Sequence, residues 1–600
     1  MEHREHQAEP NGKSRLSLSE VRGRSSFGCI KRSVASMSMM QAVSADRQGG
    51  FVVLLLYGGI AFLFFGSVHS WSRYYLGTGP DPLTYIWGLN WWPWAIQHGL
   101  NPLVTRFAWY PTGFHTAWAD LVPGGALLGL PLIVLADAVV AYNALMVLAP
   151  ALAAWCCFLL LRHLTKDTLA SVLCGYLFGF SSYELGHMLG HLSLVLVFPI
   201  PLILWIAILR ISAVIARARF ILLLTAILLL QFAFSLEVLA TMYVAGGTAW
   251  LATMLFLPGH RKRLWILAGD VSIATAILAL VTTPWLVYMY DGRNDTPEII
   301  NIPAEHSADL MNFIVPTRLF QFGGATFKFV SSKFHGNIAE NGSYLGLPLI
   351  GILVAWFRKP GPHGAVSRIL LVTMILLILL SLGPIIRVWG NLLDAWAPWQ
   401  LLLQLPLIRH ALPCRLSVYI ALLTAIAAGL WLASAQNRTS KVQRYGLCLL
   451  AIALLFPDLK RFKWSPIPFT PFFERENLER FLGTTPNVTV LPFVPIPHKD
   501  YGTMIWQFQS GMAYTQTGGY LGNPPPESYK WAATSQLVQG VAGPQFAKDI
   551  ELYAAAHNIT AVVAGPGTQP SLLHSLDELG WDNESLAGVH VYHVPRAILP

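Results

Sequence analysis

The sequence predicts an all-α polytopic membrane protein that ends in a small α/β domain. Hydrophobic residues make up 54% of the 600 residues and charged residues only 12%, whereas roughly 25% of the residues in a soluble protein are charged. The apolar residues recur in runs near the roughly 20 residues that a membrane-spanning helix needs, which predicts about 11–13 hydrophobic helices. Pro, Asn, Gly and charged residues increase again after about residue 460, which favours a domain outside the bilayer.

The first apolar segment follows a polar stretch. We expect residues 1–48 to form a disordered cytoplasmic tail and 51–68 to be an uncleaved anchor, because a signal peptide has a shorter basic region and a cleavage site. Residues 69–121 then form a first outer loop crowded with tryptophans, whose amphipathic rings favour the membrane surface. The later apolar runs predict helices near 122–137, 138–161, 168–185, 190–209, 220–236, 238–257, 264–288, 342–357, 369–384, 414–434 and 445–459.

Basic residues between the apolar runs indicate the orientation. Because cytoplasmic loops carry an excess of Lys and Arg, these clusters account for the net charge of +9 without a nucleic-acid partner. Five apolar runs precede the first cluster, so one of them does not cross; 122–137 is our first candidate and 168–185 the second. A further outer loop is expected at 289–341. The clusters are Arg210/Arg217/Arg219, Arg261/Lys262/Arg263, Arg358/Lys359/Arg368 and Arg438/Lys441/Arg444.

The change in composition near residue 460 predicts a domain boundary. We expect a transmembrane domain over 49–459 and an extracytoplasmic α/β domain over 460–600. Short apolar runs typical of strands alternate there with stretches that favour helices. The strand-like runs are Val488–Phe493, Ile559–Ala564 and Val589–Val594, and the helical stretches are Glu474–Leu482, Gln545–His557 and Ser571–Leu579.

Two aspartates lie at opposite ends of the first outer loop. Asp81 stands between two prolines, and it is either a turn former or the carboxylate that takes or orients an acceptor proton. Asp120 precedes the next apolar run, where it either caps a helix or contacts substrate. Asp81 is our candidate catalytic base and Asp120 a candidate substrate-binding residue.

Further ionisable residues fall on the same predicted side. Glu184, His187 and His191 occupy one short stretch, and Glu237 lies where two predicted helices turn. Ionisable groups at membrane depth are costly and therefore point to function. We predict a catalytic role for Glu237 and substrate binding for the other three. The four-residue spacing of the histidines leaves a divalent metal open, although no metal-binding motif is present.

A cationic stretch precedes the apolar run at 414–434. Arg409, His410 and Arg415 lie on the predicted outer side, where the positive-inside bias does not explain them. Arginine donates two parallel hydrogen bonds to phosphate, so these residues are candidate ligands for a phosphate group. Interfacial snorkelling is the alternative. Asp270, within the run 264–288, is expected to be paired near the cytoplasmic side and is not placed in the site.

These features resemble the glycosyltransferase C superfamily, membrane enzymes that use polyprenyl-phosphate sugars, and within it an uncharacterised bacterial branch. The resemblance covers the pattern of residues 50–460. By position, Asp81 matches the first-loop acidic residue that activates the acceptor, although many members carry a paired acidic motif there. The motifs that carry the likeness are Gly79-Pro-Asp-Pro82, Asn101-Pro-Leu103, Tyr110-Pro-Thr-Gly113, the stretch Phe180 to His191, and Arg409 or His410 through Arg415.

The resemblance implies a glycosyltransferase of the bacterial inner membrane. It would move a hexosyl or pentosyl group, with inversion, from a polyprenyl-phosphate donor to an extracytoplasmic glycan, lipid or protein, with Asp81 as base. No certain cofactor is implied. Two alternatives are a transporter or flippase of lipid-linked glycans and a non-catalytic scaffold of envelope glycan assembly. A transporter would need a continuous polar path through its helices, and paired broken helices are typical of that class.

Overall fold

The computed structural model describes residues 49–294, 302–405, 407–493, 502–522 and 524–599. The predicted cytoplasmic tail, 1–48, lies outside the described residues. Contacts divide the chain into residues 1–56 and 57–600, and the second unit is described below.

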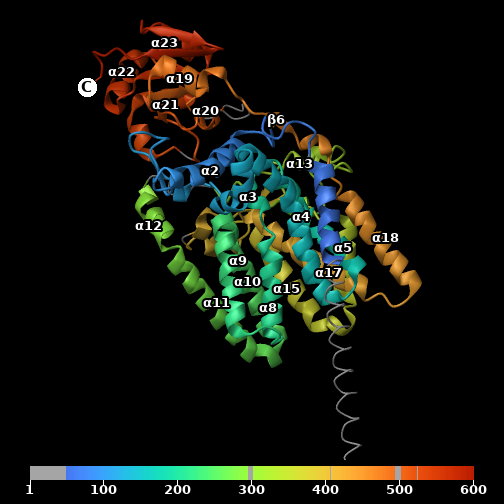
Figure 1. Cartoon of the computed structure of the whole chain (residues 1–600). Helices are drawn as coiled ribbons and strands as arrows, with labels where there is room; N and C mark the ends of the chain where they lie inside the picture. The colour runs from blue at the N-terminus through green and yellow to red at the C-terminus, as the bar shows by residue number, and fades with distance from the viewer. Residues whose placement is uncertain (1–48, 295–301, 406, 494–501, 523, 600) are drawn as a thin grey trace, which may run out of the picture. The chain divides into compact units, whose positions relative to one another are not determined.

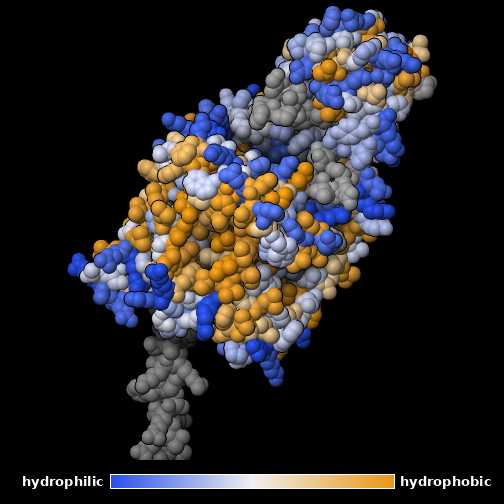
Figure 2. All heavy atoms as spheres, turned by 180° about the vertical axis from the view of Figure 1, so that it is seen from behind, coloured by the Kyte–Doolittle hydropathy of each residue, from blue (hydrophilic) through white to orange (hydrophobic). Residues whose placement is uncertain are grey.

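Seven helices among the described residues are long and apolar enough to cross a membrane. Figure 2 shows apolar side chains gathered over a broad area of the helical part, as expected of a surface that faces lipid. The seven are Ala138–Thr165, Leu192–Ile211, Arg217–Phe234, Leu236–Phe256, Pro258–Val281, Gly361–Ser381 and Pro413–Ala433, and three shorter apolar helices are Gly49–Phe65, Pro123–Leu135 and Leu347–Arg358.

The helices of this part are labelled in Figure 1, where many of them run side by side. They are α2 (Pro80–Gln97), α3 (Pro123–Leu135), α4 (Ala138–Thr165), α5 (Thr168–Gly179), α6 (Ser182–His187), α7 (Leu192–Val195), α8 (Pro199–Ile211), α9 (Arg217–Phe234), α10 (Leu236–Phe256), α11 (Arg261–Val281), α12 (Thr283–Asp291), α13 (Lys328–Ser331), α14 (Leu347–Arg358), α15 (Gly364–Ser381), α16 (Trp399–Leu402), α17 (Ser417–Ala433) and α18 (Arg438–Leu454).

The two segments predicted as possible non-spanning runs are both short helices. Helix α3 has 13 residues and α5 has 12, fewer than the roughly 17 needed to span a bilayer. The predicted helix 168–185 is interrupted because α5 ends at Gly179 and Ser181 caps a new helix, accepting a hydrogen bond from the backbone N–H of Glu184. The chain therefore leaves α5 early and places the Glu184–His191 stretch in short helices and turns.

Asp270 connects three spanning helices. Its side chain is fully buried, one oxygen accepts from Arg210 Nε at 2.9 Å, and the other accepts from Arg217 Nε at 2.7 Å. Arg210 lies at the end of α8 and Arg217 at the start of α9, and both helices contact α11. Asp270 is paired, as predicted, because each of its carboxylate oxygens accepts a hydrogen bond from an arginine side chain.

The first outer loop contains a helix that the sequence did not predict. Helix α2 begins after Gly79, which has the positive φ of 88° that glycine adopts without strain. Its tryptophans Trp87 and Trp91 stack at 5.3 Å and are almost fully buried. The Trp87 N–H donates to Gln507 Oε1 at 2.9 Å and the Trp91 N–H to the Pro102 carbonyl. The interpretation of these rings as membrane-surface anchors is wrong, because their polar ends bond within the protein.

The C-terminal part forms a five-stranded sheet with the order β10-β11-β9-β7-β8. Strand β7 is parallel to β8 and β9, and β11 is antiparallel to β9 and β10. The elements are β7 (Asn487–Leu491), β8 (Thr515–Gln516), β9 (Ala561–Ala564), β10 (Asn583–Leu586), β11 (Val589–His593), α19 (Arg475–Leu482), α20 (Thr503–Gln509), α21 (Ala532–Gln539), α22 (Phe546–His557) and α23 (Pro570–Asp577). The helices lie around the sheet (Figure 1).

Short strand pairs join segments that are distant in sequence. Strand β1 at the start of the first loop pairs with β6, just before the sheet domain. The bounds of these and the remaining strands are β1 (Tyr74–Leu76), β2 (Val104–Thr105), β3 (Phe114–His115), β4 (Ile386–Val388), β5 (Asn391–Leu393) and β6 (Trp464–Pro466).

Asp270→Leu tests whether this carboxylate holds α8, α9 and α11 together. Removing it leaves Arg210, whose side chain is 18% exposed, without its counter-charge, whereas Arg217 is already 60% exposed, so we expect a loss of about 1–3 kcal/mol of stability. Thermal unfolding in detergent measures the loss, with Asp394→Asn, at an exposed position, as the control. Equal unfolding temperatures for wild type and Asp270→Leu would contradict this role.

Candidate active site

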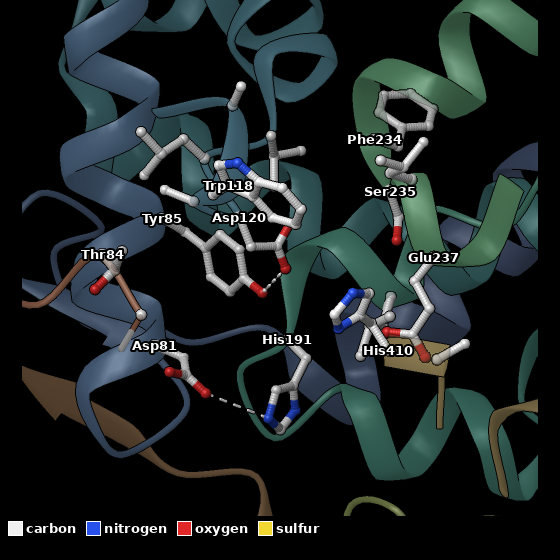
Figure 3. Close-up of a pocket in the computed structure, with 18 of the residues that line it drawn as sticks. Asp81, Thr84, Tyr85, Trp118, Asp120, His191, Phe234, Ser235, Glu237 and His410 are labelled. Atoms are coloured by element: carbon white, nitrogen blue, oxygen red, sulfur yellow. Dashed lines mark hydrogen bonds and ion pairs between the residues drawn. The ribbon is translucent and has the colours of Figure 1, made fainter. Parts of the chain in front are cut away.

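A cavity of about 420 Å³ collects most of the predicted site residues. Six of them line it: Asp81, Asp120, His191, Glu237, His410 and Arg415. Glu184, His187 and Arg409 do not. Figure 3 shows Asp81 beside His191, Tyr85 beside Asp120 above that pair, and Glu237 beside His410 to the right.

Asp81 lies in the first turn of α2 and not in an irregular turn. Pro80 takes the first helical position, where a missing N–H costs nothing, so the Pro-Asp-Pro sequence begins a helix. One carboxylate oxygen accepts from the Tyr520 hydroxyl at 3.0 Å, and the other lies 3.5 Å from His191 Nε2. The side chain is still 40% exposed, so it is held in place and yet open to an incoming group.

Asp120 does not cap a helix. The residue before α3 is Val122, and no side chain caps that helix. One Asp120 oxygen accepts hydrogen bonds from Tyr85 at 2.9 Å and from Ser193 at 2.5 Å. Asp120 is exposed at the cavity wall and is not a buried acid. Asp120 therefore binds two neighbouring side chains at the cavity wall.

Arg415 lies between two carboxylates at the other side of the cavity. It pairs with Glu237 at the start of α10 and with Glu340 from the loop before α14, whose oxygens accept from Arg415 Nε at 3.1 and 3.2 Å. Glu237 also accepts from the Leu412 N–H at 2.8 Å. Burial alone would raise the pKa of Glu340, but the Arg415 guanidinium outweighs it and lowers that pKa below the usual carboxyl range.

Glu184 and His187 are buried beside this cluster without lining the cavity. Neither oxygen of Glu184 has a hydrogen-bond partner, and burial raises its pKa well above the ordinary carboxyl value. Burial lowers the pKa of His187 to about 3, against the attraction of Glu340. The His187 ring is thus uncharged at neutral pH, and burial favours the protonated form of Glu184. Their predicted contact with substrate stays a prediction.

Arg409 and His410 form a pair at the cavity rim. Arg409 is exposed, and its Nε lies 3.2 Å from Nε2 of His410, whose ring lines the cavity. Among the described residues, no three His, Cys, Asp or Glu side chains are placed to hold a metal ion. The metal requirement stays a prediction.

Sequence reasoning missed Glu340, Tyr520 and Tyr85. Glu340 was within reach, because it is an acidic residue in the predicted outer loop 289–341. Tyr520 belongs to the C-terminal part, and no local pattern marked it. Tyr85 lies one helical turn beyond Asp81, on the same face of α2, but only recognition of that helix would have placed it there.

A family model described as "Domain of unknown function (DUF6311)" matches residues 49–460. The chain belongs to this family. A comparison with curated proteins finds no match.

Solved structures resemble this DUF6311 member over nearly its whole length. The mycobacterial arabinofuranosyltransferase AftD matches with a TM-score of 0.57 and 14% identity, covering 91% of this chain and 41% of that one. The Archaeoglobus fulgidus oligosaccharyltransferase (0.48, 13%, 92% and 75%) and ArnT from Cupriavidus metallidurans bound to undecaprenyl phosphate (0.45, 13%, 92% and 98%) are also similar. The chain thus spans about two fifths of the length of AftD.

The likeness to AftD shows the fold. The chain has the same fold as AftD, an all-α membrane domain followed by a small α/β part as the sequence predicts, and the seven candidate spans among the described residues make it a multi-pass membrane protein.

Arg415→Met tests the charged cluster. It leaves Glu237 and Glu340 unpaired, so we expect a loss of about 3 kcal/mol of stability. Adding Glu340→Gln removes one of the two unpaired charges and should recover part of that loss. Unfolding temperatures of the single and double variants measure the coupling, and Arg409→Met, at an exposed site, is the control. Strictly additive losses would contradict the pairing.

The burial of Glu184 predicts a pH-dependent cost. Burial raises the pKa of Glu184 in the folded protein. The folded protein therefore keeps a proton at pH values where the unfolded chain has released it. Stability falls as the pH rises from the ordinary carboxyl pKa to the raised pKa of the folded state. The Glu184→Gln variant has no titratable group at this position. Its unfolding temperature should match wild type near pH 4 and exceed it increasingly as the pH rises above the ordinary carboxyl pKa of about 4.3. Glu476→Gln, on the exposed face of α19, should show no such trend; a constant difference for Glu184→Gln would rule out the buried acid.

Proposed function

We propose that the protein is a membrane glycosyltransferase that moves a sugar from a polyprenyl-phosphate donor to an acceptor outside the cytoplasm. The observation that carries the proposal is the Asp81 carboxylate, held by Tyr520 and His191 at a cavity in a glycosyltransferase-C fold, and still 40% exposed. A carboxylate in that position can accept the proton of an attacking hydroxyl.

The reaction is a direct displacement. The acceptor oxygen bonds to the anomeric carbon from the face opposite the phosphate, the bond from that carbon to the phosphate oxygen breaks, and the acceptor proton passes to Asp81. The polyprenyl phosphate leaves with the bonding electrons. Because attack and departure take place on opposite faces of the anomeric carbon, the configuration at that carbon inverts. Because phosphate is a good leaving group, neighbouring positive charge suffices to stabilise it.

We assign phosphate recognition to Arg409 and His410. Their side chains lie 3.2 Å apart at the rim, and His410 reaches the cavity. Arg415 is engaged by Glu237 and Glu340, so its role is to fix the position of these two carboxylates. The Glu237 carboxylate lies on the same side of the cavity as His410 (Figure 3), and its predicted catalytic role stays a prediction.

The helix directions support an extracytoplasmic site. Helix α9 begins at Arg217 in one of the basic clusters and ends at Phe234, which lines the cavity. Its 18 residues span about 27 Å, close to the hydrocarbon thickness of a bilayer. If basic residues mark the cytoplasmic side, the cavity opens at the opposite surface, which fits a bacterial inner-membrane enzyme with an outer C-terminal domain.

Asp81→Asn tests the proposal. Membranes that contain wild type or variant are given radiolabelled polyprenyl-phosphate sugars, and transfer into glycan, lipid and protein fractions is measured. Loss of the proton acceptor should lower transfer about 10²- to 10⁴-fold. Asp394→Asn, an exposed carboxylate outside the cavity, should leave transfer unchanged. Equal transfer by wild type and Asp81→Asn would remove Asp81 from catalysis; no transfer by wild type across the donors would overturn the function.

A further inference from the structure

A second pocket lies in the C-terminal part, beside the first loop. Its volume is about 320 Å³, at the lower end of the roughly 300–1,000 Å³ typical of small-molecule sites. Five of the eleven lining residues carry aromatic rings: Trp109, Tyr110, Trp531, Tyr553 and His557. Among the described residues, none of the candidate membrane-spanning helices contributes to the lining, so an occupant would come from the aqueous side.

The aromatic wall is arranged around Trp531. Its ring meets that of His557 edge-on at 4.9 Å and that of Tyr553 at 6.0 Å. Tyr553 is buried beneath them, while Trp531 and His557 are half-buried and keep one surface toward the pocket. The rings support one another and leave a rigid apolar face open.

Polar groups complete the lining. His557 Nδ1 donates to the Tyr553 carbonyl at 2.9 Å, which makes Nε2 an acceptor, and burial lowers the pKa of His557 so that the ring stays neutral. Glu527 and Lys530 form an exposed ion pair at the margin. Flat aromatic faces beside hydroxyl-binding groups match a sugar ring, whose C–H face is apolar and whose edge carries hydroxyls.

The first loop and the segment around Thr517–Tyr520 contribute lining residues both to this pocket and to the cavity at Asp81. The first loop is attached to the sheet by hydrogen bonds from Tyr110 N to Gln516 O at 3.0 Å and from Trp109 N to Gly518 O at 3.1 Å. Thr517 lines the aromatic pocket and Tyr520 lines the cavity. Three residues span at most about 11 Å, so the two sites lie within a few sugar units of each other.

From these observations we infer that the aromatic pocket binds the acceptor glycan, with a sugar ring stacked on Trp531 and the growing end directed to Asp81. This role rests on the proposed glycosyl transfer. The binding itself does not, because it is measured without a donor.

The test uses full-length protein in a detergent without a sugar headgroup. Binding of four linear trisaccharides, built from glucose, mannose, galactose or arabinose, is measured by saturation-transfer NMR and calorimetry. We expect at least one to bind. Trp531→Ala and Tyr110→Ala should each weaken that binding about tenfold by removing ring contact. Trp396→Ala, which removes a tryptophan that is 62% exposed outside both pockets, should not.

The Asp81→Asn variant separates this inference from the transferase proposal, and it should bind the trisaccharide as wild type does. Binding without transfer would keep the saccharide site and remove its role as acceptor site. Transfer without binding of any trisaccharide, or binding that Trp531→Ala and Tyr110→Ala both leave intact, would overturn the inference. Unfolding temperatures confirm that each variant folds, and Tyr110, on the loop, gives an answer even if Trp531→Ala does not.

Discussion

The position of Arg415 between Glu237 and Glu340 governs the geometry of the cavity. The three residues come from the start of α10, the loop before α14 and the turn that leads into α17. The side chains of Arg415, Glu237 and Glu340 are only 13%, 18% and 4% exposed, so each carboxylate would be costly alone, and the guanidinium makes both tolerable. Two apolar helices and a long loop are thereby fixed at one point, and the backbone N–H of Leu412 adds a further bond to Glu237. The side of the cavity that is formed by Glu237, Glu340 and Arg415 is thus held in place by these ion pairs.

The side of the cavity that carries Asp81 depends on the C-terminal part of the chain. Helix α2, which carries Asp81, is bonded to that part at Trp87 and Asp81, through Gln507 and Tyr520 respectively. Gln507 also donates to the carbonyl of Phe107 in the same loop. The polar C-terminal part therefore fixes the position of the Asp81 carboxylate beside the membrane helices. Without either part the cavity would be incomplete.

The hydrophobic pattern allowed much of the fold to be predicted. The main spanning helices lie near their predicted ranges, and the C-terminal strands begin within two residues of the runs at Val488, Ile559 and Val589. Helix α2 was missed because its apolar residues surround the helix and pack on all sides, which removes the periodicity that marks a surface helix. Six of the residues that the predicted topology placed on the outer side line the cavity. The contact of Tyr520 with Asp81 could not be predicted in this way, because the two residues are 439 positions apart and no local sequence pattern marks it.

The pairing of Asp270 with Arg210 and Arg217 also bears on the assembly of the protein in the membrane. A carboxylate within an isolated apolar helix costs about 3 kcal/mol to insert. The chain is synthesised from its N-terminus, so both arginines are already in place when the segment with Asp270 emerges. The helix α11 can therefore dock on α8 and α9 as it enters, and its acidic group never has to face lipid without a counter-charge. The order of the elements along the chain is itself part of how this polar contact can be built.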